Sequence, residues 1–285
     1  MTDKLIFSGY IPFDKSWMIR LGFLDMINGY NDIITFLNHQ TNLSNDLLAL
    51  KDAVLIWKKN EPINVGESAT LYRLLKFASW KLKFNKEFVV EGTLKHRKIN
   101  DNPNIINLSQ KELLKLDNNT SQWATASVLL GNVERIFNPP YKLQVTYNAI
   151  EHWKHQRRKK ETWLPRYDET ILNQAKTYQR LFRGEKPKFN PPQAEDFCFA
   201  YTFGFLSLKE GQKKWPSLVS HESNRIKEIK EMLEKAKQGK DIDSKDHRII
   251  QSIAMWGKIN NKKVKILYPD SVNKSWFQFW NFLNG

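Results

Sequence analysis

The chain has 285 residues, and its 45 lysines and arginines outnumber its 30 aspartates and glutamates, which gives a formal net charge of +15. A hydrophobic fraction of 41%, with ten tryptophans and seventeen phenylalanines, excludes a wholly disordered chain and suffices for one or two folded domains. The charge predicts an anionic partner, which leaves nucleic acid, an acidic membrane surface and phosphorylated metabolites as candidates.

The cysteine count and the apolar pattern restrict the location of the protein. Cys198 is the only cysteine, so the sequence offers neither an intramolecular disulfide nor a cysteine-based zinc site. The N-terminus lacks the apolar region of a secretion signal, and no run of about twenty apolar residues could cross a membrane. We therefore expect a cytoplasmic protein with no membrane partner and no metal.

In the first half of the chain, apolar segments of strand and helix type alternate. Ser16 is the expected N-cap of a helix whose positive end carries Lys15 and Arg20. Small residues from Gly66 to Thr70 open another helix, which includes Arg73. Apolar and alternating runs predict a short strand and a turn within 4–14, and strands at 53–57, 88–91 and 142–146.

The middle of the chain is basic and then rich in proline. The run 151–160 combines Trp153 with lysines and arginines, and it fits either a nucleic-acid contact or a solvated helix face. Residues 161–189 contain prolines and few periodic apolar positions, which is typical of a linker. Glu195 and Asp196 follow, as acid/base groups or as ordinary first-turn acids of a helix.

The C-terminal part carries three charged motifs. An amphipathic helix, capped by Ser223 and ended by Gly239, separates the first two motifs, and a strand at 264–268 precedes the third. Arg225, Arg248 and Lys274 therefore lie at the ends of elements, where α/β proteins gather cations around a phosphate or a carboxylate.

Seven short motifs resemble, in the same order, those of the enolpyruvyl transferases, and most closely those of the enolpyruvylshikimate-phosphate synthases. The resemblance spans residues 15 to 280. The motifs are Lys15-Ser16-x-x-x-Arg20, Gly66–Arg73, His96–Ile99, Thr120-Ser121-Gln122, His221–Arg225, Asp246-His247-Arg248 and Val272–Trp280.

The resemblance implies an α/β fold of two lobes, built from βαβαββ repeats. The chain is too short for the family's six repeats, so fewer are expected. Residues 15–160 would form the central lobe, residues 1–14 together with 190–285 the second lobe, and residues 161–189 a linker or a compressed repeat.

The implied reaction is enolpyruvyl transfer from phosphoenolpyruvate to the 5-hydroxyl of shikimate 3-phosphate or a related alcohol, with release of phosphate and without a cofactor. Lys15 and Glu222 would act as acid/base groups, and Asp196 or Glu195 would take the hydroxyl proton, with Asp196 preferred. Phosphoenolpyruvate would contact Gln122, Arg97, Arg225, Arg248 and Lys274. The second substrate would contact Ser16, Arg20, Thr120 and Ser121.

Four residues depart from the family's motifs: Glu67, Ala69, His221 and Asn224. These departures favour a changed acceptor alcohol. Two alternatives stay open. One is a non-catalytic or re-purposed protein that binds a small phosphorylated anion, and the other, which ranks last, is a nucleic-acid-binding protein that uses the region from Trp153 to Lys160.

Overall fold

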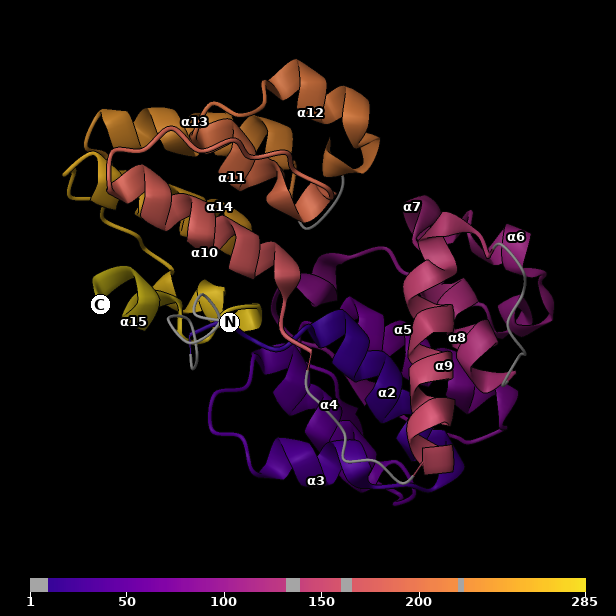
Figure 1. Cartoon of the computed structure of the whole chain (residues 1–285). Coiled ribbons are helices and arrows are strands. Elements are labelled where there is room, and N and C mark those ends of the chain that lie inside the picture. The colour runs from indigo at the N-terminus through magenta and orange to yellow at the C-terminus, as the bar shows by residue number, and fades with distance from the viewer. Residues whose placement is uncertain (1–9, 132–138, 160–165, 220–222) are drawn as a thin grey trace. The chain divides into compact units, whose positions relative to one another are not determined.

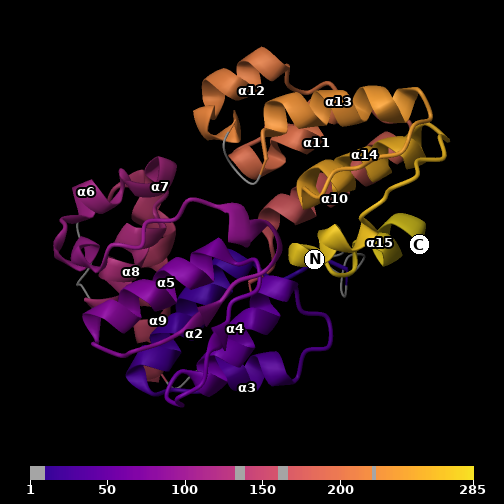
Figure 2. The same cartoon turned by 180° about the vertical axis from the view of Figure 1, so that it is seen from behind.

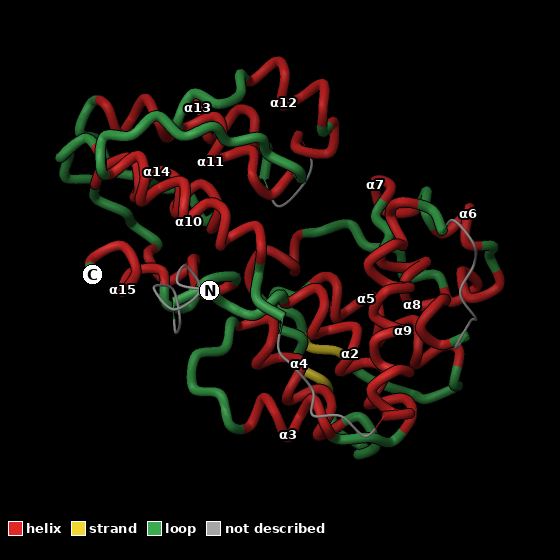
Figure 3. Tube along the Cα trace, viewed as in Figure 1, coloured by secondary structure: helices red, strands yellow, loops and turns green. Residues whose placement is uncertain are grey.

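The computed structural model describes residues 10–131, 139–159, 166–219 and 223–285 and is helical in most of them (Figure 1). Within the described residues, the one sheet pairs the two-residue strands β1 (Ile63–Asn64) and β2 (Phe88–Val89) in parallel (Figure 3). The chain divides into two compact units, Phe13–Arg166 on the one hand and Met1–Pro12 with Tyr167–Gly285 on the other.

The predicted α/β fold with βαβαββ repeats is therefore wrong. The expected strand at 53–57 belongs mostly to a helix, α4 (Asn45–Ile56), because Leu47, Leu50 and Ala53 bury one face at helical spacing. The expected strand at 142–146 forms helical turns, and that at 264–268 contributes only a single bridge between Ile242 and Ile266. Short apolar runs do not distinguish a strand from a buried helix by periodicity.

In the unit Phe13–Arg166, the central element is α2 (Lys15–Asn28), which is buried from Trp17 to Met26. Its N-cap is Asp14, which accepts a hydrogen bond from the backbone N–H of Trp17, so the expected cap at Ser16 is wrong by two residues. The helices α3 (Asp32–Asn38), α4, α5 (Ala69–Lys81), α8 (Gln122–Leu130) and α9 (Gln144–Lys159) pack around α2. Short helical segments complete this unit: η1 (Gly92–His96), η2 (Pro103–Asn107), α6 (Gln110–Leu113), α7 (Leu116–Asn119) and η3 (Tyr141–Leu143).

In the other unit, the central element is α14 (His247–Ile259), and α10 (Glu169–Phe182) lies beside it in both views (Figures 1 and 2). Around α14 also pack α11 (Phe197–Thr202), α13 (Arg225–Lys237), α15 (Phe279–Asn284) and η6 (Pro269–Lys274). The remaining elements are η4 (Ala194–Asp196), α12 (Leu208–Lys214) and η5 (Pro216–Val219). Trp276 and Phe279 are fully buried in an aromatic core.

The predicted amphipathic helix near the C-terminus is confirmed as α13. Its buried face includes Ile229, Met232 and Leu233, and Gly239 follows it with φ +69°. Asn224 caps the helix in place of the expected Ser223. Among the described residues, no helix has the length and apolar character that a transmembrane span requires.

Candidate anion-binding site

Lys15, Ser16 and Arg20, predicted to contact substrate, all lie on α2. The Lys15 ammonium forms a 2.8 Å ion pair with Asp46. The buried Arg20 guanidinium donates from Nη1 to the Ser16 hydroxyl at 2.6 Å and from Nε to the Thr146 hydroxyl at 3.1 Å. Burial lowers the pKa of Arg20 to about 10, and the Asp14 carboxylate partly opposes this. Lys15 is thus paired with Asp46 on α4, and Arg20 binds Ser16 within α2 and Thr146 on α9.

Two other motifs of the same unit meet at Arg73, which was not among the predicted site residues. Arg73 donates to the Gln122 side chain at 2.5 Å and pairs with Asp117 at 2.7 Å. Gln122 in turn donates to Thr70 at 2.7 Å. Burial lowers the pKa of Arg73, the bond to Asp117 raises it, and the nearby charge of Arg97 lowers it further. Gln122 therefore holds a buried ion pair in place.

The remaining predicted residues of this unit lie near the same cluster. Thr120 and Ser121 are half-buried at the start of α8, where the Thr120 hydroxyl accepts from the Gln122 N–H at 3.4 Å. Arg97 is half-buried directly after η1. The Asp117 carboxylate also accepts from the Trp123 indole at 2.9 Å. Asp117, 44 positions from Arg73 in the sequence, is the residue that organises this cluster.

In the other unit, the predicted cation Arg225 is engaged by Asp246. The two side chains are 2% and 1% exposed, and they meet at 2.7 Å (Nε to Oδ2) and 3.3 Å (Nη2 to Oδ1). Asp246 also caps α14 by accepting from the backbone N–H of Arg248 at 2.9 Å. The buried salt bridge between Asp246 and Arg225 thus joins α13 to α14. The resemblance had assigned no role to Asp246.

Arg248 differs from the other buried arginines. The residue is 4% exposed in the first turn of α14, and its Nε and Nη1 atoms are buried without a hydrogen-bond acceptor in the described ranges. Leaving a buried neutral donor without an acceptor destabilises a folded protein by roughly 1–3 kcal/mol, and the cost is larger when the donor belongs to a charged group. The guanidinium therefore presents two donors that an anion could satisfy.

Asp196, predicted as a proton acceptor, lies within the electrostatic field of Arg248. Its carboxyl group is 1% exposed and accepts from the Gln174 amide at 2.7 Å. Burial raises the pKa of Asp196 to about 6, while the bond from Gln174 and the charge of Arg248 oppose the rise. No ion pair joins Asp196 to Arg248 in the part of the chain that the structure describes. Asp196 can thus change its protonation near neutral pH, beside a cation.

Further polar groups surround the first turns of α14. Gln251, one turn after Arg248, donates to the Ser275 hydroxyl at 3.2 Å, and its own carbonyl oxygen has no donor among the described residues. Ser275 follows the predicted cation Lys274, which is 9% exposed in η6. This unit therefore buries several polar groups around one helix end, two of them with unused hydrogen-bonding capacity.

The predicted acid Glu222 and the departing residue His221 lie outside the described residues. Within those that the structure describes, no three histidine, cysteine, aspartate or glutamate side chains are grouped so as to hold a metal ion. Cys198 is buried, and burial raises the pKa of its thiol. No role in this site follows for it.

Two residues of the basic run considered for nucleic acid, Trp153 and Arg157, are engaged inside their own unit. The Trp153 indole donates to Asp25 at 2.8 Å, and Arg157 pairs with Asp25 at 2.5 Å and with Asp32 at 2.6 Å. The Arg157 guanidinium also lies 3.8 Å from the centre of the Tyr30 ring. Trp153 and Arg157 therefore hold α9 against the end of α2 and the start of α3.

Sequence reasoning missed Gln174, because the segment 161–189 was interpreted as a linker. The segment contains α10, whose buried positions Ile171, Gln174, Ala175 and Tyr178 recur at helical spacing. That spacing was a usable signal, although a glutamine in the apolar stripe weakens it.

No protein-family model, no curated protein and no solved structure significantly matches this chain.

Proposed function

We propose that this protein binds a small phosphorylated or carboxylated anion at the Arg248 guanidinium. The observation that carries the proposal is the burial of Nε and Nη1 of Arg248 without an acceptor in the described ranges. Each of these two N–H groups can donate a charge-assisted hydrogen bond to an oxygen of an anion, and each such bond contributes about 1.5–3 kcal/mol.

Phosphoenolpyruvate is the first ligand to test. The motifs around Arg225, Arg248 and Lys274 resemble the part of the enolpyruvyl transferases that holds this compound. The helical architecture removes the family's fold as support, so the proposal depends on Arg248 and its surroundings. A phosphorylated metabolite as ligand agrees with the cytoplasmic location expected from the sequence.

Asp196 makes binding dependent on pH. An anion at Arg248 adds negative charge near a carboxyl group whose pKa is already about 6, so binding raises this pKa further. We therefore expect the protein to take up a proton when the anion binds near neutral pH. A structural arginine with no ligand would produce no such coupling.

Calorimetric titration with phosphoenolpyruvate, inorganic phosphate and pyruvate tests the binding. Arg248→Lys keeps the charge but loses the Nε and Nη1 donors, and we expect it to weaken phosphoenolpyruvate binding by roughly tenfold to a hundredfold. Lys227→Met, at an exposed position of α13, is the control and should leave the affinity unchanged. Equal affinities of wild type and Arg248→Lys, or no binding of any of the three anions, would contradict the proposal.

A second candidate function is enolpyruvyl transfer from phosphoenolpyruvate to an alcohol. It is favoured by one observation, a buried carboxyl group with a pKa of about 6 in the field of Arg248, which suits general acid/base catalysis. Release of phosphate on mixing the protein with phosphoenolpyruvate and shikimate 3-phosphate, lost in Asp196→Asn, would support transfer. Binding of phosphoenolpyruvate without phosphate release would contradict transfer and support anion binding only.

A further inference from the structure

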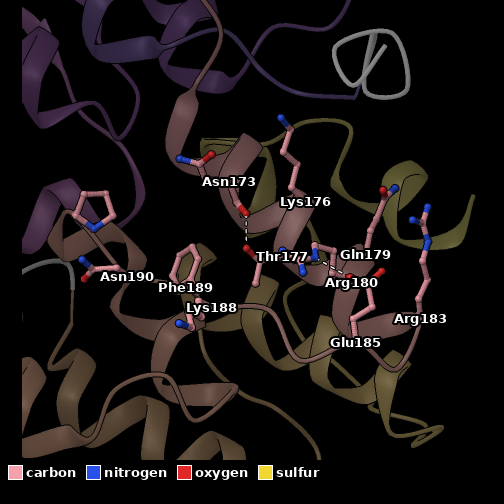
Figure 4. A pocket seen from close by; sticks show the side chains of 11 residues that line it. Asn173, Lys176, Thr177, Gln179, Arg180, Arg183, Glu185, Lys188, Phe189 and Asn190 are labelled. Carbon is pink, nitrogen blue, oxygen red and sulfur yellow. Dashed lines mark hydrogen bonds and ion pairs between the residues drawn. The ribbon is translucent and has the colours of Figure 1, made fainter. Parts of the chain in front are cut away.

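A groove of about 640 Å³ runs along α10 and the segment that follows it, in the unit that also holds Arg248 (Figure 4). Its basic side chains are Lys176, Arg180, Arg183 and Lys188, and its one acidic side chain is Glu185. The groove residues do not include Arg248 or Asp196, so it is a separate feature from the buried anion site.

The groove keeps a positive charge after its internal ion pair is counted. Arg180 and Glu185 form an ion pair, the dashed line between them in Figure 4, with 2.7 Å between Nε and Oε2, and both side chains remain substantially exposed. Arg183 and Lys188 are exposed, and neither forms an ion pair with a described residue. Like charges in one groove repel each other, so their arrangement needs a reason other than the stability of the fold.

Two cations of α10 and the arginine that directly follows the helix lie along one face. Lys176, Arg180 and Arg183 stand at positions i, i+4 and i+7, whereas Ile171, Ala175 and Tyr178 bury another face in the core. The stripe from Lys176 to Arg183 is about 10 Å long at the rise of an α-helix. This length exceeds a single phosphate group and suits successive phosphates of one strand.

Groups that suit bases and sugars accompany the cations. The amide side chains of Asn173, Gln179 and Asn190 line the groove, and they can both donate and accept hydrogen bonds. At the end of α10, Phe182 is 55% exposed, and its ring centre lies 6.0 Å from that of Tyr178. Phe182 is not one of the residues that line the groove, but it directly precedes Arg183 in the chain, and unpaired bases stack on exposed aromatic rings that lie near basic side chains.

We propose that this groove binds the sugar–phosphate backbone of single-stranded nucleic acid. Arg180, Arg183 and Lys188 contact phosphates, the amides contact sugars or base edges, and Phe182 stacks on a base. The formal net charge of +15 adds a long-range attraction that raises the association rate. This surface differs from the run Trp153–Lys160, whose Trp153 and Arg157 side chains are engaged within their own unit.

Fluorescence anisotropy of labelled oligo-dT and oligo-U strands, measured over a range of salt concentrations, tests the proposal. The double variant Arg183→Glu with Lys188→Glu removes two groove cations. Its matched control is Lys227→Glu with Lys230→Glu on the exposed face of α13, which changes the net charge equally. We expect the groove variant to bind at least about tenfold more weakly than the control and to lower the salt slope by about 1.4, or 0.7 for each lost phosphate contact.

The milder variant Arg183→Gln with Lys188→Gln removes the two charges without introducing acids, so it is less disruptive to the fold. It should also bind the oligonucleotides more weakly than the control and lower the salt slope. Circular dichroism and phosphoenolpyruvate binding should stay unchanged in both groove variants, so that this proposal and the function of Arg248 fail separately. Equal weakening in groove and control variants, no oligonucleotide binding at low salt, or stronger binding to mononucleotides, acidic peptides or phosphatidylserine vesicles would each overturn the proposal.

Discussion

Two buried arginines, one in each unit, have opposite surroundings. In the unit Phe13–Arg166, Arg73 has a carboxylate partner in Asp117 and an amide partner in Gln122. In the other unit, Arg248 is buried to a similar extent, yet two of its donor atoms have no acceptor in the described ranges. Burial alone therefore does not mark a functional arginine, and the difference lies in whether the protein itself supplies the acceptors.

This difference separates a structural role from a ligand-binding role. A buried ion pair is damaged by the loss of either partner, because the other charge is left in a poorly solvating environment. A buried cation without a partner already bears that cost, so its removal should relieve the unligated protein and harm only binding. Substitutions at the two arginines and at nearby carboxylates test this separation.

Asp117→Ala should be the most damaging change. Asp117 accepts from Arg73 at 2.7 Å, from Trp123 at 2.9 Å and from the backbone N–H of Asn100 at 3.0 Å. Its loss leaves a buried guanidinium unpaired, and we expect a destabilisation of about 3–5 kcal/mol. Urea unfolding followed by tryptophan fluorescence measures it, and a loss under about 1 kcal/mol would show that Arg73 is not held by this pair.

Asp196→Asn should change how stability depends on pH. The folded protein releases the Asp196 proton near pH 6 and the unfolded chain near pH 4, so ionisation costs the wild type about 3 kcal/mol as the pH rises through this range. The contribution is present below about pH 4 and is lost above about pH 6. Asparagine does not ionise and escapes this cost. The free energy of unfolding of the variant, relative to that of the wild type, should therefore rise by about 3 kcal/mol between acidic and neutral pH.

Urea unfolding at the two ends of that range provides the measurement. Parallel pH profiles of wild type and Asp196→Asn would show that Asp196 titrates normally, and its assignment as an acid/base group would then fail.

Arg248→Met should stabilise the unligated protein by about 1–2 kcal/mol, because it removes buried donors that have no acceptor in the described ranges. Arg73→Met is the matched comparison and should destabilise the protein, since it leaves Asp117 without its partner. Thermal unfolding without added anions measures both variants. If both substitutions destabilise the protein to the same extent, Arg248 has a structural role like that of Arg73.

Lys15→Met should have the smallest effect. The ion pair of Lys15 with Asp46 lies at the start of α2, where the Lys15 side chain is 26% exposed, and we expect a loss of about 1 kcal/mol or less. The same variant tests the acid/base role that the resemblance gives Lys15. If phosphate release from phosphoenolpyruvate is observed in the wild type, its retention in Lys15→Met would exclude that role.

The sequence predicted elements whose signals are local. The apolar stripe of α13 and the glycine that follows it, Gly239, lie within one short segment of the chain. The helix and its end were therefore predictable from the sequence. The strand at 53–57 was wrong because five apolar residues fit a strand and the last turns of a helix equally well, and only packing around α2 decides between them.

The candidate site was predictable only in part, for the same reason. Arg248 was predicted from its motif and Asp196 from its place at the start of a helix. The pairing of Arg225 with Asp246 and of Arg73 with Asp117, in contrast, depends on contacts across 21 and 44 positions. No sequence pattern states which buried cation keeps an acceptor. This is what separates a structural arginine from one that awaits a ligand, and it required coordinates.

The most direct test is the Nε–H signal of Arg248 in a proton–nitrogen correlation spectrum during titration with phosphoenolpyruvate. The signal is assigned by its absence in Arg248→Lys, and the corresponding signal of Arg73 serves as an internal reference. We expect the Arg248 signal to shift saturably while that of Arg73 stays in place. A stationary Arg248 signal in the presence of bound phosphoenolpyruvate, or equal shifts of both signals, would contradict an anion site at this guanidinium.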